Sequence, residues 1–283
     1  MVKNQTYPPS VKPGIPKLGP KPKGWREVAF GEILKVVSRP EKVDPNTRYQ
    51  LVKAKRSRGG IVPRGKLLGR EILTKTQFTI RANDFLISRR QIIHGACGIV
   101  PKSLDGALVS NEYSTLVPKD GLLLPYLGYY THTTHFQQTC FHSSVGVAVE
   151  KMIFKLDDWL RHRIYLPPIS EQRRIVTILS SLDLAIDKTG KLIEAKRKLK
   201  KSLADQLLTG QRRLPGFGEP ADGSEVPSGW NRVPLKDVAR FRGGVGFPEI
   251  DQGSHSNGIP FIKPYSPKNL LINSGYKTLK MPS

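Results

Sequence analysis

The stretch of residues 167–211 limits, more than any other, the folds open to this chain. Its apolar side chains recur every seven residues on three neighbouring series, which together form a single stripe along one helix. Pro167 and Pro168 prevent helix upstream, Glu171 suits the positive end of the helix dipole, and Gly210 can end the helix in a left-handed conformation. A helix of about 40 residues is roughly 60 Å long, which is too long for an ordinary globular domain, so the stripe needs a partner helix.

The stripe is the predicted contact surface for that partner. The alternative, which the pattern alone leaves open, is a long core helix inside one large domain. The residues predicted to pack are Ile175, Ile178, Leu179, Leu182, Ile186, Leu192, Ile193, Leu199, Leu203 and Leu207.

The charge of the chain points to a polyanionic partner. Forty-six Lys and Arg against 23 Asp and Glu give a formal net charge of +23, and residues 1–70 alone hold 17 basic and 4 acidic side chains. Nucleic acid is the first candidate partner and an anionic membrane is the second. No run approaches the ~20 apolar residues of a membrane span, and the N-terminus has no apolar signal core. We therefore expect a cytoplasmic protein without a membrane partner.

The cysteine and histidine content argues against a disulfide framework and against a metal centre. Cys97 and Cys140 belong to no CxxC pair and lie at no zinc-finger spacing, so we expect buried free thiols. His132, His135 and His142 lie near Cys140 in the sequence, but without a carboxylate beside them they are more typical of surface residues. We predict no metal site and no catalytic residue in this chain.

The most basic stretch runs from Arg48 to Arg70, with eight basic side chains and no acidic one. Glycines and a proline divide it into turns, which favours basic loops over a solvated helix face. Such loops can follow a phosphate backbone, with an affinity that falls as salt rises. For any single residue, a merely solubilising role remains an alternative. The DNA-binding candidates here are Lys53, Lys55, Arg56, Arg58, Arg64 and Lys66.

Four further candidates for DNA contact lie later in the chain. Arg89 and Arg90 end a predicted strand, where adjacent side chains point to opposite faces, so one of them is free to reach a guanine edge. Ser143 and Ser144 stand in a loop of small residues whose hydroxyls could contact phosphate or bases.

Composition and an internal repeat divide the chain into segments. Residues 1–23 hold six prolines and five lysines, which predicts a disordered basic tail. Residues 24–168 have the composition of a globular domain, and residues 212–226 that of a linker. The phrase KPKGWREVAFGEIL then returns as EVPSGWNRVPLKDVA, with Trp230 lying 205 residues after Trp25. Residues 227–283 are therefore predicted to begin a second, incomplete copy of the domain.

These features together resemble the specificity subunit of Type I restriction-modification enzymes. The family's central helical region, with its Pro-Pro turn, EQ(R/K)-I start and QLLTG end, is similar to LPPISEQRRIVTILSSLDLAIDKTGKLIEAKRKLKKSLADQLLTGQRR. The body of its target recognition domain is similar to RANDFLISRR with LVSNEYSTLVP, and the start of the second such domain resembles GIPFIKPYSPKN. The resemblance covers residues 24–283.

The resemblance implies an α+β fold class. On this resemblance, the chain would comprise a globular mixed α/β target recognition domain over residues 24–168, a long coiled-coil helix as spacer over residues 169–211, and the start of a second similar domain. Each recognition domain would read one half of a split double-stranded DNA site. The spacer helices would pair in an antiparallel arrangement and bind methyltransferase subunits. With its second half incomplete, the chain is either a fragment or half of a pair formed by two copies through the long helix.

The resemblance also assigns the chemistry to other chains. Methyltransferase subunits would use S-adenosylmethionine to methylate adenine, and restriction/translocase subunits would use ATP and Mg²⁺. This chain would be a non-catalytic subunit that carries no cofactor.

Two other functions explain the sequence less completely. A stand-alone adenine-specific DNA methyltransferase would need a (D/N)PP(Y/F) segment, whereas the Pro-Pro pairs here are flanked as YPPS and LPPI. A nonspecific nucleic-acid-binding protein would explain the charge but neither the repeat nor the striped helix.

Overall fold

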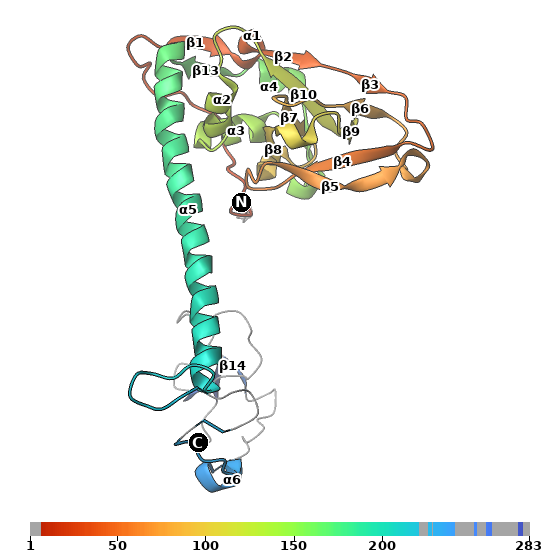
Figure 1. The fold of residues 1–283 in the computed structure, drawn as a ribbon. Helices are drawn as coiled ribbons and strands as arrows, with labels where there is room; N and C mark the ends of the chain where they lie inside the picture. The colour runs from red at the N-terminus through yellow and green to blue at the C-terminus, as the bar shows by residue number, and fades with distance from the viewer. Residues whose placement is uncertain are drawn as a thin grey trace. The chain divides into compact units, whose positions relative to one another are not determined.

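The computed structural model describes residues 7–220, 226–227 and 229–240, and the backbone of 252–253, 259–261 and 277–279. The chain divides into two compact units, Met1–Glu194 and Ala195–Ser283 (Figure 1). Helix α5 (Ile169–Leu208) begins in the first unit and ends in the second. Among the described residues, no helix combines the length and the apolar character needed to cross a bilayer.

Two β-sheets, one antiparallel and one mixed, form the body of the first unit. A four-stranded antiparallel sheet has the order β2 (Leu34–Val37), β10 (Tyr113–Pro118), β7 (Phe85–Ser88), β8 (Cys97–Ile99). A five-stranded sheet has the order β3 (Pro40–Glu41), β6 (Gln77–Thr79), β9 (Leu108–Ser110), β4 (Arg48–Ala54), β5 (Ile61–Leu68). Its β4–β9 pair is parallel and its other pairs are antiparallel.

Two smaller strand pairs and several short helices complete this unit. The paired strands are β1 (Arg26–Ala29) with β13 (Arg163–Leu166), and β11 (Ser144–Val145) with β12 (Ile153–Phe154). The α-helices are α1 (Phe30–Ile33), α2 (Leu124–Tyr130), α3 (Thr134–His142) and α4 (Leu156–Leu160). The 3-10 turns are η1 (Gly69–Glu71), η2 (Ile92–His94), η3 (Lys102–Leu104) and η4 (Val149–Lys151).

The second unit is described only in part. It contains α6 (Leu235–Val238) and a three-stranded antiparallel sheet with the order β14 (Gln252–Gly253), β16 (Lys277–Leu279), β15 (Ile259–Phe261). The predicted linker over residues 212–226 and the predicted second domain over residues 227–283 lie largely outside the described residues, so both assignments stay predictions.

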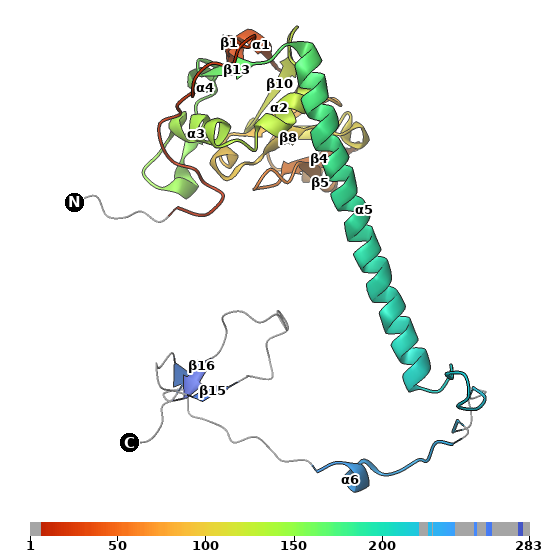
Figure 2. The same ribbon diagram turned by 90° about the vertical axis from the view of Figure 1, so that its left-hand side faces the viewer.

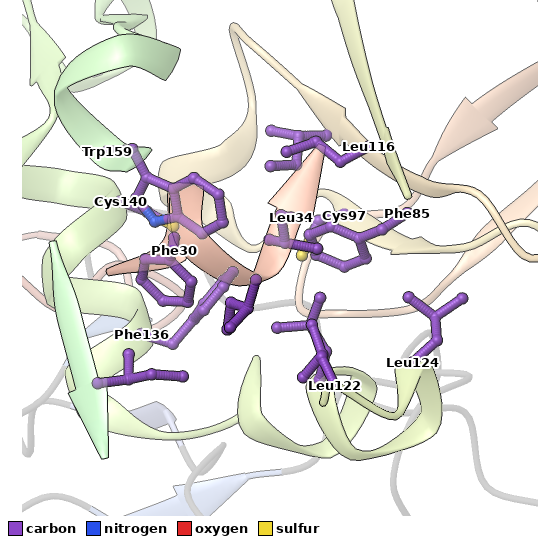
Figure 3. Close-up of a cluster of buried hydrophobic side chains, with 14 of the residues drawn as sticks. Phe30, Leu34, Phe85, Cys97, Leu116, Leu122, Leu124, Phe136, Cys140 and Trp159 are labelled. Atoms are coloured by element: carbon purple, nitrogen blue, oxygen red, sulfur yellow. The ribbon is translucent and has the colours of Figure 1, made fainter. Parts of the chain in front are cut away.

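The main core of the first unit is built around Trp159, which is fully buried. Its indole stacks on the ring of Phe30, with centroids 4.1 Å apart, and lies edge-on to Phe136 (Figure 3). The indole Nε1–H donates to Thr139 Oγ1 at 3.1 Å, so this large side chain is buried without an unpaired donor. Cys140 lies in the same core, and it and Cys97 are buried free thiols, as the sequence predicts.

Helix α5 is attached to this core by its first turns. Gln172 is fully buried; its Oε1 accepts the Leu123 N–H at 2.8 Å, and its Nε2 donates to the carbonyls of Gly121 and Pro167. Further contacts extend the attachment along the helix: Trp25 Nε1–H donates to Glu171 Oε2 at 3.1 Å, and Tyr129 O–H donates to Asp183 Oδ2 at 2.7 Å. Ile175 and Val176 pack on the core between these bonds.

The helix and the fold class are confirmed. The observed helix of Ile169–Leu208 ends three residues before the predicted bound at 211, and the first unit is a mixed α+β domain. Within the first unit, Figures 1 and 2 show the helix continuing beyond α2, which lies beside its first turns. One residue of the predicted stripe has another role, because Ile175 packs on the core of its own domain rather than facing a partner.

Two local expectations were wrong. The basic stretch of Arg48–Arg70 forms mainly the hairpin β4–β5 rather than loops, because glycine and proline in it are accommodated at a bulge and a turn. The tail predicted to be disordered packs on the domain where it is described: Val11 is 3% exposed, and the ring of Tyr7 lies edge-on to Phe141. The apolar residues of a proline-rich segment can be buried by a neighbouring domain, which composition does not reveal.

Replacing Gln172 with Met should destabilise the first unit by roughly 2–4 kcal/mol, because a thioether of similar size leaves the Leu123 N–H and two carbonyls without partners. Urea unfolding followed by tryptophan fluorescence measures the change. Gln206→Met, a matched change at a half-buried position of the same helix, should alter the free energy of unfolding by less than ~0.5 kcal/mol. Equal effects of the two changes would contradict the anchoring role of Gln172.

Candidate nucleic-acid interface

The hairpin β4–β5 carries exposed basic side chains on a two-stranded ribbon. Lys53, Lys55, Arg64 and Lys66 are exposed, and within the described part of the chain none of them forms an ion pair with an acidic side chain. The register shifts where Leu51 and Val52 of β4 lie opposite Gly65 and Pro63, which makes Arg64 the extra residue of a bulge. The ribbon therefore presents uncompensated positive charge.

The turn that joins the two strands is held in a strained conformation. Ser57 and Arg58 both have positive φ angles, 55° and 57°, in the left-handed region that non-glycine residues seldom occupy. Each such residue costs on the order of 1 kcal/mol, and the cost is offset by bonds from the turn to η2. The Ser57 N–H donates to the His94 carbonyl at 2.7 Å, and the Arg58 N–H donates to the Gly95 carbonyl at 2.9 Å.

This turn packs the guanidinium of Arg58 against Gly95. A Cβ atom at Gly95 would lie 3.1 Å from Arg58 Cζ, so the absence of a side chain there makes room for the guanidinium. Nε and Nη2 of Arg58 are buried, and no hydrogen-bond partner for them lies among the described residues. Burial lowers the pKa of Arg58, while the group stays charged at neutral pH. The result is a fixed cation with unused donors beside the basic ribbon.

Glu150 links the same turn to a loop far along the chain. Arg56 Nη2 donates to Glu150 Oε2 at 2.8 Å, and Arg56 Nε donates to Gln91 Oε1 at 2.8 Å. The other carboxylate oxygen of Glu150 lies 3.2 Å from Nε2 of His94, which is buried and whose Nδ1 lies 3.1 Å from Ser10 Oγ. Three segments distant in sequence therefore meet at this carboxylate, and Ser10 adds a fourth through the other nitrogen of His94.

The other predicted contacts have different surroundings. Arg90 is bound by both oxygens of Glu112, at 2.6 Å from Nε and 3.2 Å from Nη2. Arg89 is half-buried, and its buried Nε has no hydrogen-bond partner in the part of the chain that the structure describes. The structure contradicts Ser143 and Ser144 as direct contacts: both are buried, and Ser144 Oγ donates to the Cys140 carbonyl at 2.7 Å. The Ser144 hydroxyl therefore serves the backbone, and Ser143 Oγ is buried without a hydrogen-bond partner in the described part of the chain.

Sequence reasoning missed the acidic and neutral residues of this region. Glu150, Gln91 and His94 position Arg56 and the hairpin turn, yet each lies alone in the sequence among unrelated residues. The one signal available was an isolated glutamate in a chain with a large excess of basic residues. Among the described residues, no group of three or more His, Cys, Asp or Glu is placed to hold a metal ion.

Comparison with known proteins gives a consistent result. Residues 22–197 match the family described as Type I restriction modification DNA specificity domain. The Type I restriction enzyme MjaVIII specificity subunit of Methanocaldococcus jannaschii is 28% identical over 255 residues, which are 86% of this chain and 55% of that protein. The putative type I restriction enzyme MjaX specificity subunit of the same organism is 28% identical over 151 residues, 52% of this chain and 35% of that protein. The chain thus spans about half, or less, of these relatives' length.

Solved structures share the fold. The HsdS subunit from Thermoanaerobacter tengcongensis superposes with a TM-score of 0.50 at 22% identity, covering 93% of this chain and 66% of that one. A chain from a structural study of complex assembly and conformational transition of the type I R-M system superposes with a TM-score of 0.57 at 23% identity. The superposition covers 87% of this chain and 62% of that one.

The charges around His94 predict opposite effects of two substitutions on its pKa. Burial lowers this pKa most, the positive charge of Arg56 lowers it further, and Glu150 raises it. Arg56→Gln should therefore raise the pKa of His94, and Glu150→Gln should lower it, as measured by NMR titration of the imidazole protons. Lys55→Gln, which removes an equal charge from the neighbouring residue, should leave it unchanged. Shifts of the same sign in Arg56→Gln and Glu150→Gln would refute this arrangement.

Proposed function

Because the chain belongs to the family of Type I restriction modification DNA specificity domains, we propose that it is a DNA-recognition chain of such a system and reads one half of a split duplex site. The match, residues 22–197, covers the domain from Pro22 onward and most of helix α5. Methylation and cleavage belong, in this proposal, to separate methyltransferase and restriction/translocase subunits. S-adenosylmethionine, ATP and Mg²⁺ are then the cofactors of those subunits, and the chain works in the cytoplasm beside the chromosome.

The hairpin β4–β5 is the proposed DNA-reading element. The major groove of B-DNA, about 12 Å wide, admits a two-stranded β-ribbon. A ribbon that bears Lys53, Lys66 and the bulged Arg64 can place ammonium and guanidinium groups against phosphates on both sides of that groove. The single observation that carries the proposal is this uncompensated basic ribbon in a domain of the matched family.

The arginines differ in their availability to bases. Glu112 occupies the fork of Arg90, so a base edge would have to displace a bidentate carboxylate. Arg89 is half-buried and forms no ion pair within the described residues, which makes it the better candidate for reading a guanine, whereas Nε and Nη2 of Arg58 are buried and out of reach of a base. Arg56 is held by Gln91 and Glu150 and positions the turn.

The exposed stripe of α5 supports assembly with other chains. Ile178 is 61% exposed and Ile186 is 70% exposed, and their neighbours Leu182, Leu192, Ile193 and Leu199 are exposed as well. Leaving so much apolar surface in water is unfavourable by about 25 cal/mol per Å². We assign this face to a second spacer helix, supplied by a longer chain or by a second copy, and to the methyltransferase subunit.

Coexpression with its methyltransferase subunit tests the proposal. Genome-wide mapping should find N6-methylated adenines confined to one short sequence context, and the chain alone should transfer no methyl groups. The Arg89→Gln variant should accept more contexts, because it removes the donors available to a base, whereas Arg90→Gln should retain the original context. Methyl transfer by the chain alone, or methylation without sequence preference, would overturn the proposal.

Charges placed in the stripe should prevent assembly. Replacing Ile178, Leu192 and Leu199 with Glu should abolish the complex with the methyltransferase subunit in size-exclusion chromatography, because three carboxylates cannot be buried unpaired. The domain should stay folded, since the three side chains are exposed there. A matched control variant carries three Glu residues outside the stripe, in place of Thr177, Ser181 and Gly190, and should assemble normally. Assembly of the stripe variant would show that this face is not the contact surface.

A further inference from the structure

The charge along helix α5 changes sharply at its middle. Residues 169–187, which include the turns attached to the domain, hold two basic and three acidic side chains. Residues 188–201 hold seven basic side chains and one acidic, Glu194. All the residues from 181 to 202 are exposed. The positive charge of the helix is therefore concentrated in the part beyond its attachment.

Most of these basic side chains share one face. Lys191 and Lys198 are seven residues apart and Lys201 follows Lys198 by three, so these three lie along one side of the helix, with Lys188 and Arg197 at the two edges of that side. This side lies away from the apolar stripe and stays open when a partner helix covers the stripe. Two basic residues of the same segment, Lys196 and Lys200, fall instead on the seven-residue series of the stripe.

The acidic side chains on this face only partly balance its basic ones. Solvated helix faces usually combine acidic and basic residues at spacings of three and four, each such pair contributing ~0.2–0.5 kcal/mol, and like charges at those spacings cost a similar amount. Arg197 and Lys201 are such a like pair, as are Lys198 and Lys201. The acidic residues on this face are Asp187, which pairs with Lys191 at 2.7 Å, and Glu194, so five basic side chains against two acidic ones leave an excess of three positive charges.

The helix dipole does not account for the charge either. Cations are stabilised near a helix C-terminus, but the effect is confined to the last turn. The helix ends at Leu208, about two turns beyond Lys201. The basic face is therefore an unfavourable feature of the isolated helix that a polyanion would stabilise.

We propose that the face formed by Lys188, Lys191, Arg197, Lys198 and Lys201 binds the phosphate backbone of the duplex beside the half-site, so that the spacer helix contacts DNA as well as setting a distance. The inference rests on the proposed DNA-reading function. Duplex DNA is favoured as the occupant because the basic face is roughly 20 Å long, and a duplex presents a charge every ~1.7 Å of that length. Such contacts are independent of sequence and suit the unread base pairs of a split site.

Two double variants of the full chain test the proposal. Lys198→Gln with Lys201→Gln removes two charges from the basic face, and Lys196→Gln with Lys200→Gln removes two charges from the stripe side of the same turns. Gln and Lys have similar helix propensities, and circular dichroism checks that the helix is retained. The probe is a fluorescent duplex of random sequence, whose binding is followed by anisotropy over a series of KCl concentrations.

The first double variant should make the slope of log K against log[KCl] shallower by about 1.8, which is 0.9 for each lost phosphate contact. The second should leave the slope nearly unchanged. Equal changes in both variants would show that net charge alone matters, and no change in either would show that the helix does not touch DNA. A first variant that binds DNA normally but fails to assemble with the methyltransferase subunit would assign the face to an acidic protein surface. Each of these three outcomes overturns the proposal.

A third double variant separates this inference from the proposed function. Lys53→Gln with Lys66→Gln alters the hairpin and leaves the helix intact. If it weakens DNA binding while the helix variant does not, the helix inference alone fails. If neither the hairpin variant nor the helix variant changes DNA binding, both the helix inference and the DNA-reading function fail. The same conclusion follows if the unaltered chain binds no duplex.

Discussion

The buried amide of Gln172 determines how the long helix leaves the domain. One side chain bonds the backbone at Gly121, Leu123 and Pro167, and thereby joins the segment before α2 to the first turn of α5. Such a group is costly to bury without partners and specific in geometry when all its bonds are made. The bond of Tyr129 to Asp183, more than two turns later, fixes the direction in which the helix continues. A reading element on this domain consequently keeps a constant orientation relative to the start of the helix.

The acidic side chains of the domain determine which basic side chains are paired and which stay free to bind a ligand. Glu150 engages Arg56, Glu112 engages Arg90, and the buried Asp84 engages Arg39 through two bonds. These pairs connect loops and strand ends of the domain. The lysines of the hairpin β4–β5 have no such partners among the described residues, and the same holds for Arg197, Lys198 and Lys201 of the helix. Positive charge is thus neutralised where it positions the chain and left free on exposed surfaces, where it can attract a polyanion.

Several features of the fold were predictable because they depend on local pattern. The seven-residue spacing from Ile178 to Leu199 predicts a long helix whatever surrounds it, and the family follows from phrases such as SEQRRI and QLLTG. Residues 107–118 show where this reasoning fails. They alternate like one strand, yet they form β9 and β10 in two different sheets, separated by a turn at Asn111 and Glu112. Alternation records which side chains are buried and carries no information on which strand is the neighbour.

The sequence by itself determined the length of the spacer helix, its apolar stripe, the excess of positive charge and the family. Each of these is a property of residue type and spacing along the chain. Only the tertiary structure decided that the basic stretch around Lys53 is a ribbon, that Arg90 is occupied by Glu112, and that Ser143 and Ser144 are buried. Partners such as Arg56 and Glu150 lie 94 residues apart, and their meeting depends on how the whole domain packs. Long-range contacts of this kind select, from many chemically suitable side chains, those that remain free to bind.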